Sequence, residues 1–146
     1  MDVYDASFFL STAWIGPFWI LMLAYPEDER TEKAMRGPWF FLGPVAIWFA
    51  VSLSDPNALS ELFGDMMSSQ PLDALATLLG TKAGASAAWA HMVAGDIFVT
   101  RWIWKRSLEM GVEPWIRTTS IFFAVMLMPV GVAMHVAMAR SADANA

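Results

Sequence analysis

The residues best suited to chemistry in this chain lie in the apolar stretch 85–104, ASAAWAHMVAGDIFVTRWIW. This stretch is long enough to cross a bilayer, yet it carries His91, Asp96 and Arg101. An ionised Asp or Arg near the centre of a membrane helix costs about 2.5–3.5 kcal/mol on insertion scales. We therefore expect these side chains to face the interior of a helix bundle. Together with His135, near the end of the last apolar segment, they form the candidate catalytic set.

The composition indicates a small multi-pass membrane protein. The chain has 146 residues, of which 57% are hydrophobic and 16% are charged, whereas soluble domains are usually about 45–50% apolar. The charged residues cluster in 26–36, around 101–117 and near the two ends. The net charge of −5 argues against nucleic acid as a partner. No cysteine is present, which excludes disulfides, thiolate metal sites and a cysteine nucleophile.

Four apolar segments predict an all-α fold, a four-helix transmembrane bundle. We expect a single integral membrane domain over residues 1–140, followed by a tail at 141–146. The helices are expected at about 7–25, 38–54, 85–106 and 117–138, because a spanning helix needs about 20 apolar residues. Between helices two and three, apolar residues recur at helical spacing, which predicts one or two interfacial helices. The residues of this stripe are Leu59, Leu62, Phe63, Met66 and Met67, and then Leu72, Leu75 and Leu79.

The basic residues predict how this bundle is oriented. The loop after helix one and the region from the end of helix three to the start of helix four hold Arg30, Lys33, Arg36, Arg101, Lys105, Arg106 and Arg117; Lys82 and Arg140 lie on the other side. This asymmetry places the two basic loops in the cytoplasm and both termini on the outer side. The N-terminus has Asp2 and Asp5 but no basic residue, unlike a secretory signal. We therefore expect a bacterial inner membrane, with both termini periplasmic.

The topology also predicts where the candidate residues lie relative to one another. His91 and His135 are expected at similar depth in the outer half of the membrane, with Asp96 nearer the midplane. At about 100° per residue, Trp89, Asp96 and Thr100 share one face of a helix, and His91 lies about 140° away from Asp96. A direct bond between His91 and Asp96 within one regular helix is therefore not expected.

Other interpretations of these residues stay open. One is a buried polar network, in which Asp96 bonds to Thr100 or an arginine and each histidine bonds to a carbonyl freed by a proline. The prolines concerned are Pro17, Pro44 and Pro129. A b-type haem held by two histidines is geometrically allowed, as is a metal at a His/His/Asp site. Because the sequence offers no further ligands, we predict no metal site and no required cofactor, and we do not expect haem.

The order of residues around the candidate set matches a known pattern. The matching residues are Ala85, Ser86, Ala87, Trp89, His91, Asp96, Phe98 and Arg101, preceded by Pro17, Phe18, Leu21, Met22, Pro26, Thr31 and Lys33 and followed by Pro129, Val130, Gly131 and His135. In this order and spacing the chain resembles the neoxanthin synthase family, the abscisic-acid-deficient-four-like membrane proteins of plants, algae and bacteria. The resemblance covers about residues 7–137. The chain lacks a plastid transit region and so resembles a bacterial-type member.

The resemblance implies a reaction. Plant members are implicated in turning the epoxide end group of violaxanthin into the allenic end group of neoxanthin, an isomerisation with no redox change. Such a reaction needs an acid to protonate the epoxide oxygen and a base to remove a proton from the adjacent polyene carbon. By resemblance, Asp96 or His91 is the base, His135 or His91 is the acid, and Arg101 holds Asp96 ionised or orients the network.

The resemblance also implies a ligand. The substrate would be a carotenoid or another isoprenoid within the membrane lipid, and the expected enzyme class is a carotenoid isomerase. The residues expected to contact it are Trp89, Phe98, Pro129 and Gly131. The alternative, from a different class, is a non-catalytic accessory subunit that packs against a membrane-protein partner such as a photosynthetic complex.

Overall fold

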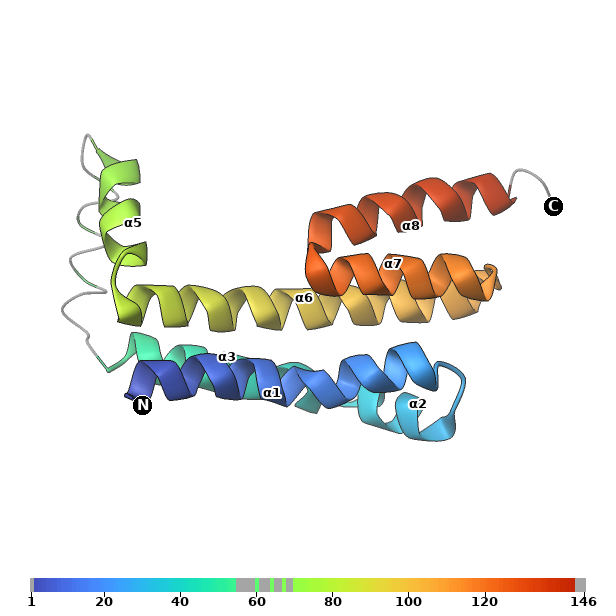
Figure 1. Ribbon diagram of the computed structural model, residues 1–146, viewed down its shortest axis with the longest axis horizontal. Coiled ribbons are helices and arrows are strands. Elements are labelled where there is room, and N and C mark those ends of the chain that lie inside the picture. The colour runs from blue at the N-terminus through green and yellow to red at the C-terminus, as the bar shows by residue number, and fades with distance from the viewer. Residues whose placement is uncertain (1, 55–59, 61–63, 65–66, 68–69, 144–146) are drawn as a thin grey trace. The chain divides into compact units, whose positions relative to one another are not determined.

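The computed structural model describes residues 2–54, 60, 64, 67 and 70–143, and their regular secondary structure is entirely helical. Figure 1 shows the helices in chain order: α1 (Val3–Ala24), α2 (Glu29–Arg36), α3 (Trp39–Ser52), α5 (Pro71–Leu79), α6 (Lys82–Met110), α7 (Pro114–Met126) and α8 (Met128–Asp143). The prediction of an all-α fold is therefore confirmed for the described part of the chain.

The helices contribute to two compact units. Unit 1 consists of Met1–Trp14 and Leu42–Ala94, and unit 2 consists of Ile15–Phe41 and Gly95–Ala146. Helices α1, α3 and α6 each supply residues to both units. The single membrane domain expected over residues 1–140 stays a prediction.

Polar side chains set the beginnings of the first two helices. Helix α1 begins at Val3, earlier than expected, because the Asp2 carboxylate accepts the backbone N–H groups of Tyr4 (3.0 Å) and Asp5 (2.9 Å). Helix α2, in the charged loop, was not predicted. It begins after Asp28, whose side chain accepts the Arg30 N–H at 2.7 Å. Each helix thus starts at an acidic cap that satisfies backbone donors which have no partner within the helix.

Within the described part of the chain, two helical stretches are long and apolar enough to cross a membrane, judged by length and composition. They are Val3–Ala24 and Glu29–Ser52, of which the second combines α2 and α3. Helix α6 has 29 residues but is not among them, because His91, Asp96 and Arg101 lower its mean hydropathy. The four-helix transmembrane bundle therefore stays a prediction.

Part of the expected interfacial segment is helical. Leu72, Leu75 and Leu79 lie on α5, which begins at Pro71 because the fixed φ of proline suits the first position of a helix. Leu59, Leu62, Phe63 and Met66 of the predicted stripe lie outside the described residues. The location of α5 at a membrane interface stays a prediction.

The single helix expected over 117–138 is two helices in the structure. Leu127, between α7 and α8, has φ −150° and ψ 88°, which is not helical. Pro129 favours a break here because, in a continuous helix, it has no N–H to donate to the carbonyl four residues earlier and its ring clashes with that carbonyl. The two helices then pack against each other (Figure 1). At Gly131 they are so close that an added Cβ would lie 2.2 Å from the backbone nitrogen of Ala124.

This helical hairpin returns the chain to the turn between α6 and α7. Ala139, on α8, packs in a buried cluster with Val112 and Ile116. At 1.5 Å per residue, α7 and α8 are roughly 20 and 24 Å long, shorter than the ~30 Å hydrocarbon core of a bilayer. The structure thus differs from the single helix expected here, because the end of α8 lies beside the turn between α6 and α7. A membrane crossing by this segment and the side on which the C-terminus lies stay predictions.

Candidate functional site

The four predicted catalytic residues are divided between the two units. His91 belongs to unit 1, and Asp96, Arg101 and His135 belong to unit 2. Their catalytic roles stay predictions, and the surroundings of each residue are described within its own unit.

In unit 1, α6 presents Trp89 and His91. The Trp89 indole N–H donates to Oγ1 of Thr12 at 2.9 Å, and its ring stacks on Phe8 with centroids 4.7 Å apart. His91 is exposed, and its ring centroid lies 6.3 Å from that of Trp48. Trp89 is therefore fixed by α1, whereas the His91 nitrogens have no hydrogen bond within the described part of the chain.

In unit 2, His135 is buried between α8 and the C-terminal half of α6. Its Nδ1 lies 3.5 Å from Oγ of Ser107, and the Trp102 ring lies edge-on with centroids 5.4 Å apart. The α7–α8 hairpin explains this contact, because α8 packs back against α7 and brings His135 to Ser107. The expected equal depth of the two histidines stays a prediction, since the two residues belong to different units. One interpretation of the sequence gave His135 a backbone carbonyl freed by a proline as its partner. The structure instead places the Ser107 hydroxyl beside its Nδ1.

Asp96 is half-buried, and its carboxylate has no hydrogen bond or ion pair among the described residues. The Thr100 hydroxyl donates instead to the backbone carbonyl of Asp96 at 2.9 Å. The same hydroxyl oxygen accepts the indole N–H of Trp19 at 3.0 Å. The expected hydrogen bond between Asp96 and Thr100 thus forms at the backbone carbonyl of Asp96 and not at its carboxylate. The carboxylate oxygens are therefore able to accept hydrogen bonds or a proton from another group.

Replacing Thr100 by valine is expected to destabilise the protein by about 1 kcal/mol, because a hydrogen bond of this kind contributes about that much. Valine keeps the shape of threonine but leaves the Trp19 N–H without its acceptor. Thermal unfolding of the detergent-purified protein measures the loss. Thr118→Val, at an exposed position of α7, is the control, and an equal effect at both positions would contradict the assignment.

Arg101 is directed to the first loop rather than to Asp96. Its Nε donates to the backbone carbonyl of Met35 at 2.8 Å, and its guanidinium carbon lies 5.2 Å from the centre of the Phe40 ring. Phe98 packs near Phe40 and Phe41, with centroids 6.2 and 6.0 Å away. Arg101 therefore links α6 to the end of α2 through the Met35 hydrogen bond and to the start of α3 through its contact with Phe40.

The remaining two predicted substrate contacts lie on α8. Pro129 is exposed near the start of this helix, and Gly131 is buried against α7. Packing of the hairpin accounts for Gly131 in the structure, and a substrate contact at either residue stays a prediction.

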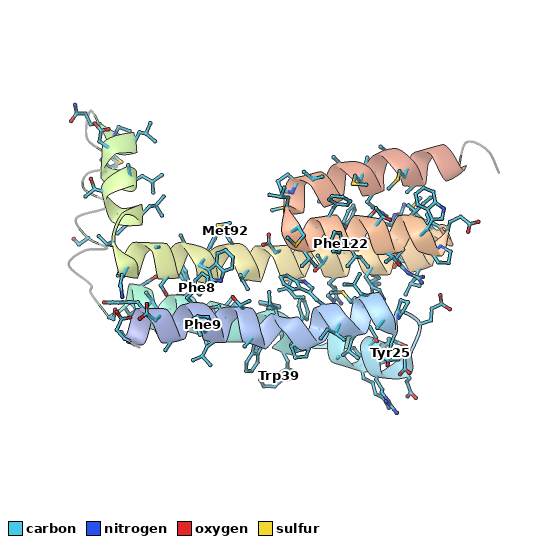
Figure 2. All side chains as sticks on the ribbon, viewed as in Figure 1. Phe8, Phe9, Tyr25, Trp39, Met92 and Phe122 are labelled. Carbon is cyan, nitrogen blue, oxygen red and sulfur yellow. The ribbon has the colours of Figure 1, made fainter. Side chains whose placement is uncertain are left out.

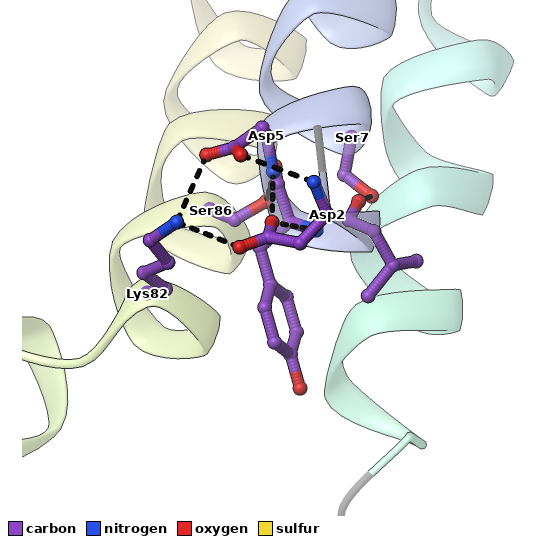
Figure 3. Close-up of polar contacts among 7 residues, drawn as sticks. Asp2, Asp5, Ser7, Lys82 and Ser86 are labelled. Atoms are coloured by element: carbon purple, nitrogen blue, oxygen red, sulfur yellow. Dashed lines mark hydrogen bonds and ion pairs between the residues drawn. The ribbon is translucent and has the colours of Figure 1, made fainter.

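A charged cluster in unit 1 was not predicted as a site. Figure 3 shows the Lys82 ammonium reaching Oδ2 of Asp2 at 2.6 Å and Oδ1 of Asp5 at 3.3 Å. Ser86, one turn further along α6, donates its hydroxyl to the backbone carbonyl of Tyr4 at 3.3 Å. The sequence did contain a signal: Lys82 and the acidic N-terminus were assigned to the same side of the membrane.

This cluster gives the N-terminus a pH-dependent stability. The hydrogen bond from Lys82 lowers the pKa of Asp2 from 3.8 to about 2, and the bonds to Asp2 and Asp5 raise the pKa of Lys82 above 10.5. Because the pKa of Asp2 is depressed in the folded state, its contribution is present above pH 3.8 and is lost as the pH falls towards 2. The contribution of Lys82 is present below pH 10.5 and is lost as the pH rises through its raised pKa.

In the Lys82→Met variant, the pKa of Asp2 is expected to return towards 3.8. The pH titration of the Asp2 carboxyl carbon by NMR measures this change. Lys33→Met, which breaks the exposed pair of Lys33 with Glu29 on α2, is the control. An Asp2 titration that is the same in wild type and Lys82→Met would rule out the ion pair.

Contacts in unit 2 join the first loop to the second basic region. The buried Arg117 guanidinium lies 3.2 Å from the Glu27 carboxylate, and the Trp104 indole N–H donates to the Pro26 carbonyl at 2.8 Å. The sequence places Arg117 among the basic residues and Trp104 among the aromatic residues, but it does not identify their partners. Those partners, Glu27 and Pro26, lie far away along the chain. Elsewhere in this unit, Ser120 has a buried hydroxyl without a partner among the described residues.

The regular secondary structure of the described residues is thus all helical, and these residues include two apolar stretches of membrane-crossing length. The chain belongs to the ABA DEFICIENT 4-like family, whose model matches residues 6–135. The resemblance found in the sequence to abscisic-acid-deficient-four-like proteins is thereby confirmed.

One curated relative shows how far the similarity extends. The chain is 25% identical over 136 residues to "Protein ABA DEFICIENT 4, chloroplastic" of Arabidopsis thaliana, and the match covers 92% of this chain. The match spans 60% of the length of that relative. No solved structure matches the chain.

Proposed function

We propose that this protein is a bacterial-type multi-pass membrane protein that binds a carotenoid or a related isoprenoid and isomerises it by acid–base chemistry. The observation that carries the proposal is the family match over residues 6–135, because the family is related to carotenoid metabolism in plants. The relative in Arabidopsis is longer than the match, so its activity is not transferred as a whole.

The exposure of the apolar helices supports a membrane location. In an apolar run of 18 residues within each of the two stretches of membrane-crossing length, 17% and 22% of the residues are buried, whereas a helix in the core of a soluble protein is mostly buried. Large apolar side chains are exposed on several helices, and Figure 2 labels Phe8, Phe9, Tyr25, Trp39, Met92 and Phe122. Surfaces of this kind suit contact with lipid.

The contacts of the loops support an orientation. Glu27 and Arg117 join the two regions that the positive-inside rule assigns to the cytoplasm. We place these loops on the cytoplasmic side of a bacterial inner membrane and the N-terminus on the periplasmic side. The α7–α8 hairpin then enters from the cytoplasmic side and returns to it, together with the C-terminus.

Asp96 is the base in the proposed reaction. Its carboxylate, without a described partner, would take a proton from the polyene carbon next to the epoxide. The electron pair of that C–H bond forms the new double bond of the allene, the epoxide C–O bond breaks, and the oxygen takes a proton from an acid. His135, which belongs to the same unit as Asp96, is the proposed acid. Atoms and electrons balance, so the reaction needs no redox cofactor.

An absorption spectrum and pigment extraction of the detergent-purified protein test this proposal. A carotenoid spectrum, with the pigment recovered in the extract, is the expected result. A Soret band would instead indicate the haem alternative. A colourless preparation that co-purifies with a larger complex would overturn the proposal in favour of a non-catalytic accessory subunit.

A further inference from the structure

A cleft of about 480 Å³ lies in unit 2, between the first loop and the C-terminal half of α6. Its lining residues come from 26–36 and 101–109. Two hydrogen bonds hold the two sides together: Trp104 donates to the Pro26 carbonyl and Arg101 donates to the Met35 carbonyl, both at 2.8 Å. The cleft is therefore built by specific contacts between the loop and α6.

The carboxylates that line this cleft are all engaged. The ion pairs are Glu27–Arg117 (3.2 Å), Glu32–Arg36 (2.8 Å) and Glu109–Lys105 (3.7 Å), and Asp28 accepts the Arg30 N–H at the start of α2 (2.7 Å). Each negative charge on the wall is thus matched by a cation or by the N-terminus of a helix. The cleft has no uncommitted anion among its described residues.

Arg101 is the cation of this cleft that lacks a carboxylate partner among the described residues. Only its Nε has a described acceptor, the Met35 carbonyl, while the Phe40 ring lies 5.2 Å from the guanidinium carbon. The four N–H donors of its terminal amino groups have none in the described part of the chain. A half-buried guanidinium with a free fork of donors is suited to bind an oxyanion with two parallel hydrogen bonds.

We propose that this cleft binds a phosphate group through the terminal amino groups of Arg101. Lys105 and Arg36, which line the same cleft, hold only exposed ion pairs, and such pairs are weak. Each also has more N–H donors than its ion pair uses, so both can donate to the further oxygens of a phosphate while Glu32 and Glu109 stay paired. A carboxylate has only two oxygens, which Arg101 alone would occupy. The group is the headgroup of an anionic phospholipid or a free phosphate, and the proposal rests on unit 2 alone, not on the proposed carotenoid chemistry.

The test measures the shift of the thermal unfolding midpoint of the purified protein against ligand concentration, at constant ionic strength. The probes are inorganic phosphate and phosphatidylglycerol in micelles, with phosphatidylcholine as the zwitterionic comparison. Wild type is expected to be stabilised in a saturable way. In Arg101→Gln, binding is expected to weaken by about tenfold or more, because the two charge-assisted hydrogen bonds of the guanidinium are lost.

Arg106→Gln is the matched control, because it removes the same charge from the same helix but at an exposed residue that does not line the cleft. It is expected to change binding less than about twofold, as weak surface pairs contribute little. If Arg101→Gln does not fold, Arg101→Lys, which keeps the charge but loses the fork, replaces it and is also expected to bind more weakly than wild type.

The outcomes separate the two sources of phosphate. A shift with phosphatidylglycerol but not with inorganic phosphate identifies a lipid headgroup, and the reverse identifies a free phosphate. No saturable shift of wild type with either probe would overturn the proposal, as would equal weakening in Arg101→Gln and Arg106→Gln. Pigment content is measured in a separate experiment. Failure of the phosphate proposal would therefore not affect the proposed carotenoid function, which the absorption spectrum tests.

Discussion

The Asp96→Asn variant is expected to retain bound pigment but to form the isomerised product at least about a hundredfold more slowly, as for loss of a general base. Asparagine has nearly the same shape as aspartate, but its amide cannot take a proton from carbon. The carboxylate has no hydrogen bond or ion pair among the described residues. The substitution therefore removes the base without breaking a described contact, and folding and pigment content should change little.

Product formation is measured by extracting the pigment at successive times and comparing the epoxide and allene forms. Glu113→Gln is the matched control, because Glu113 is an exposed carboxylate before α7 that makes no capping hydrogen bond through its side chain. A wild-type rate in Asp96→Asn would show that Asp96 is not the base. Loss of pigment with an unchanged melting temperature would assign Asp96 to binding instead.

The helices of this protein could be predicted from hydrophobicity because long apolar runs need internal backbone hydrogen bonds wherever they are buried in lipid or protein. The residues at which the helices begin depended on capping side chains and on local ion pairs. The early start of α1 at Val3 follows from capping by Asp2. Helix α2 had signals of its own, the cap at Asp28 and the pairs of Glu29 with Lys33 and of Glu32 with Arg36, spaced by one helical turn.

The hairpin could not be predicted from the sequence in the same way. A proline in an apolar segment kinks a helix or ends it, and both outcomes begin from the same residue, Pro129. What decides between them is packing: Gly131 allows α8 to approach Ala124 on α7. Gly131 and Ala124 lie on opposite sides of the helix break at Leu127. The hydrophobicity of the segment does not indicate that they meet.

The candidate site shows the same division between local and long-range information. The spacing of Asp96 and Thr100 predicted their contact, and the structure has it, although at the backbone carbonyl. The partners from other helices, Trp19 for Thr100 and Ser107 for His135, depend on tertiary packing. Side-chain types and helical periodicity therefore did not indicate which residues meet. They also did not identify every inward residue, since Thr100 and His135 are buried but His91, expected to face the interior, is exposed.

The Gly131→Ala variant is expected to lower the free energy of unfolding by about 2–3 kcal/mol, the upper part of the range for overpacking. The added Cβ would lie 2.2 Å from the nitrogen and 2.4 Å from the Cα of Ala124. Both are backbone atoms of α7, which cannot move aside as a flexible side chain can. Helix α8 would be displaced, and His135, one turn further on, would lose its position beside Ser107.

The sign of the change in stability distinguishes this steric clash from the usual effect of replacing a helical glycine by alanine. In an exposed helical position, replacing glycine by alanine stabilises a protein by up to about 1 kcal/mol. Gly95 on α6 has no described atom within 4 Å of its added Cβ, so Gly95→Ala should raise the melting temperature while Gly131→Ala lowers it. Stabilisation by both substitutions would mean that α8 does not pack on α7 at Gly131. Because the position of His135 depends on that packing, the environment of this buried histidine should change only in Gly131→Ala, as its NMR signals would show.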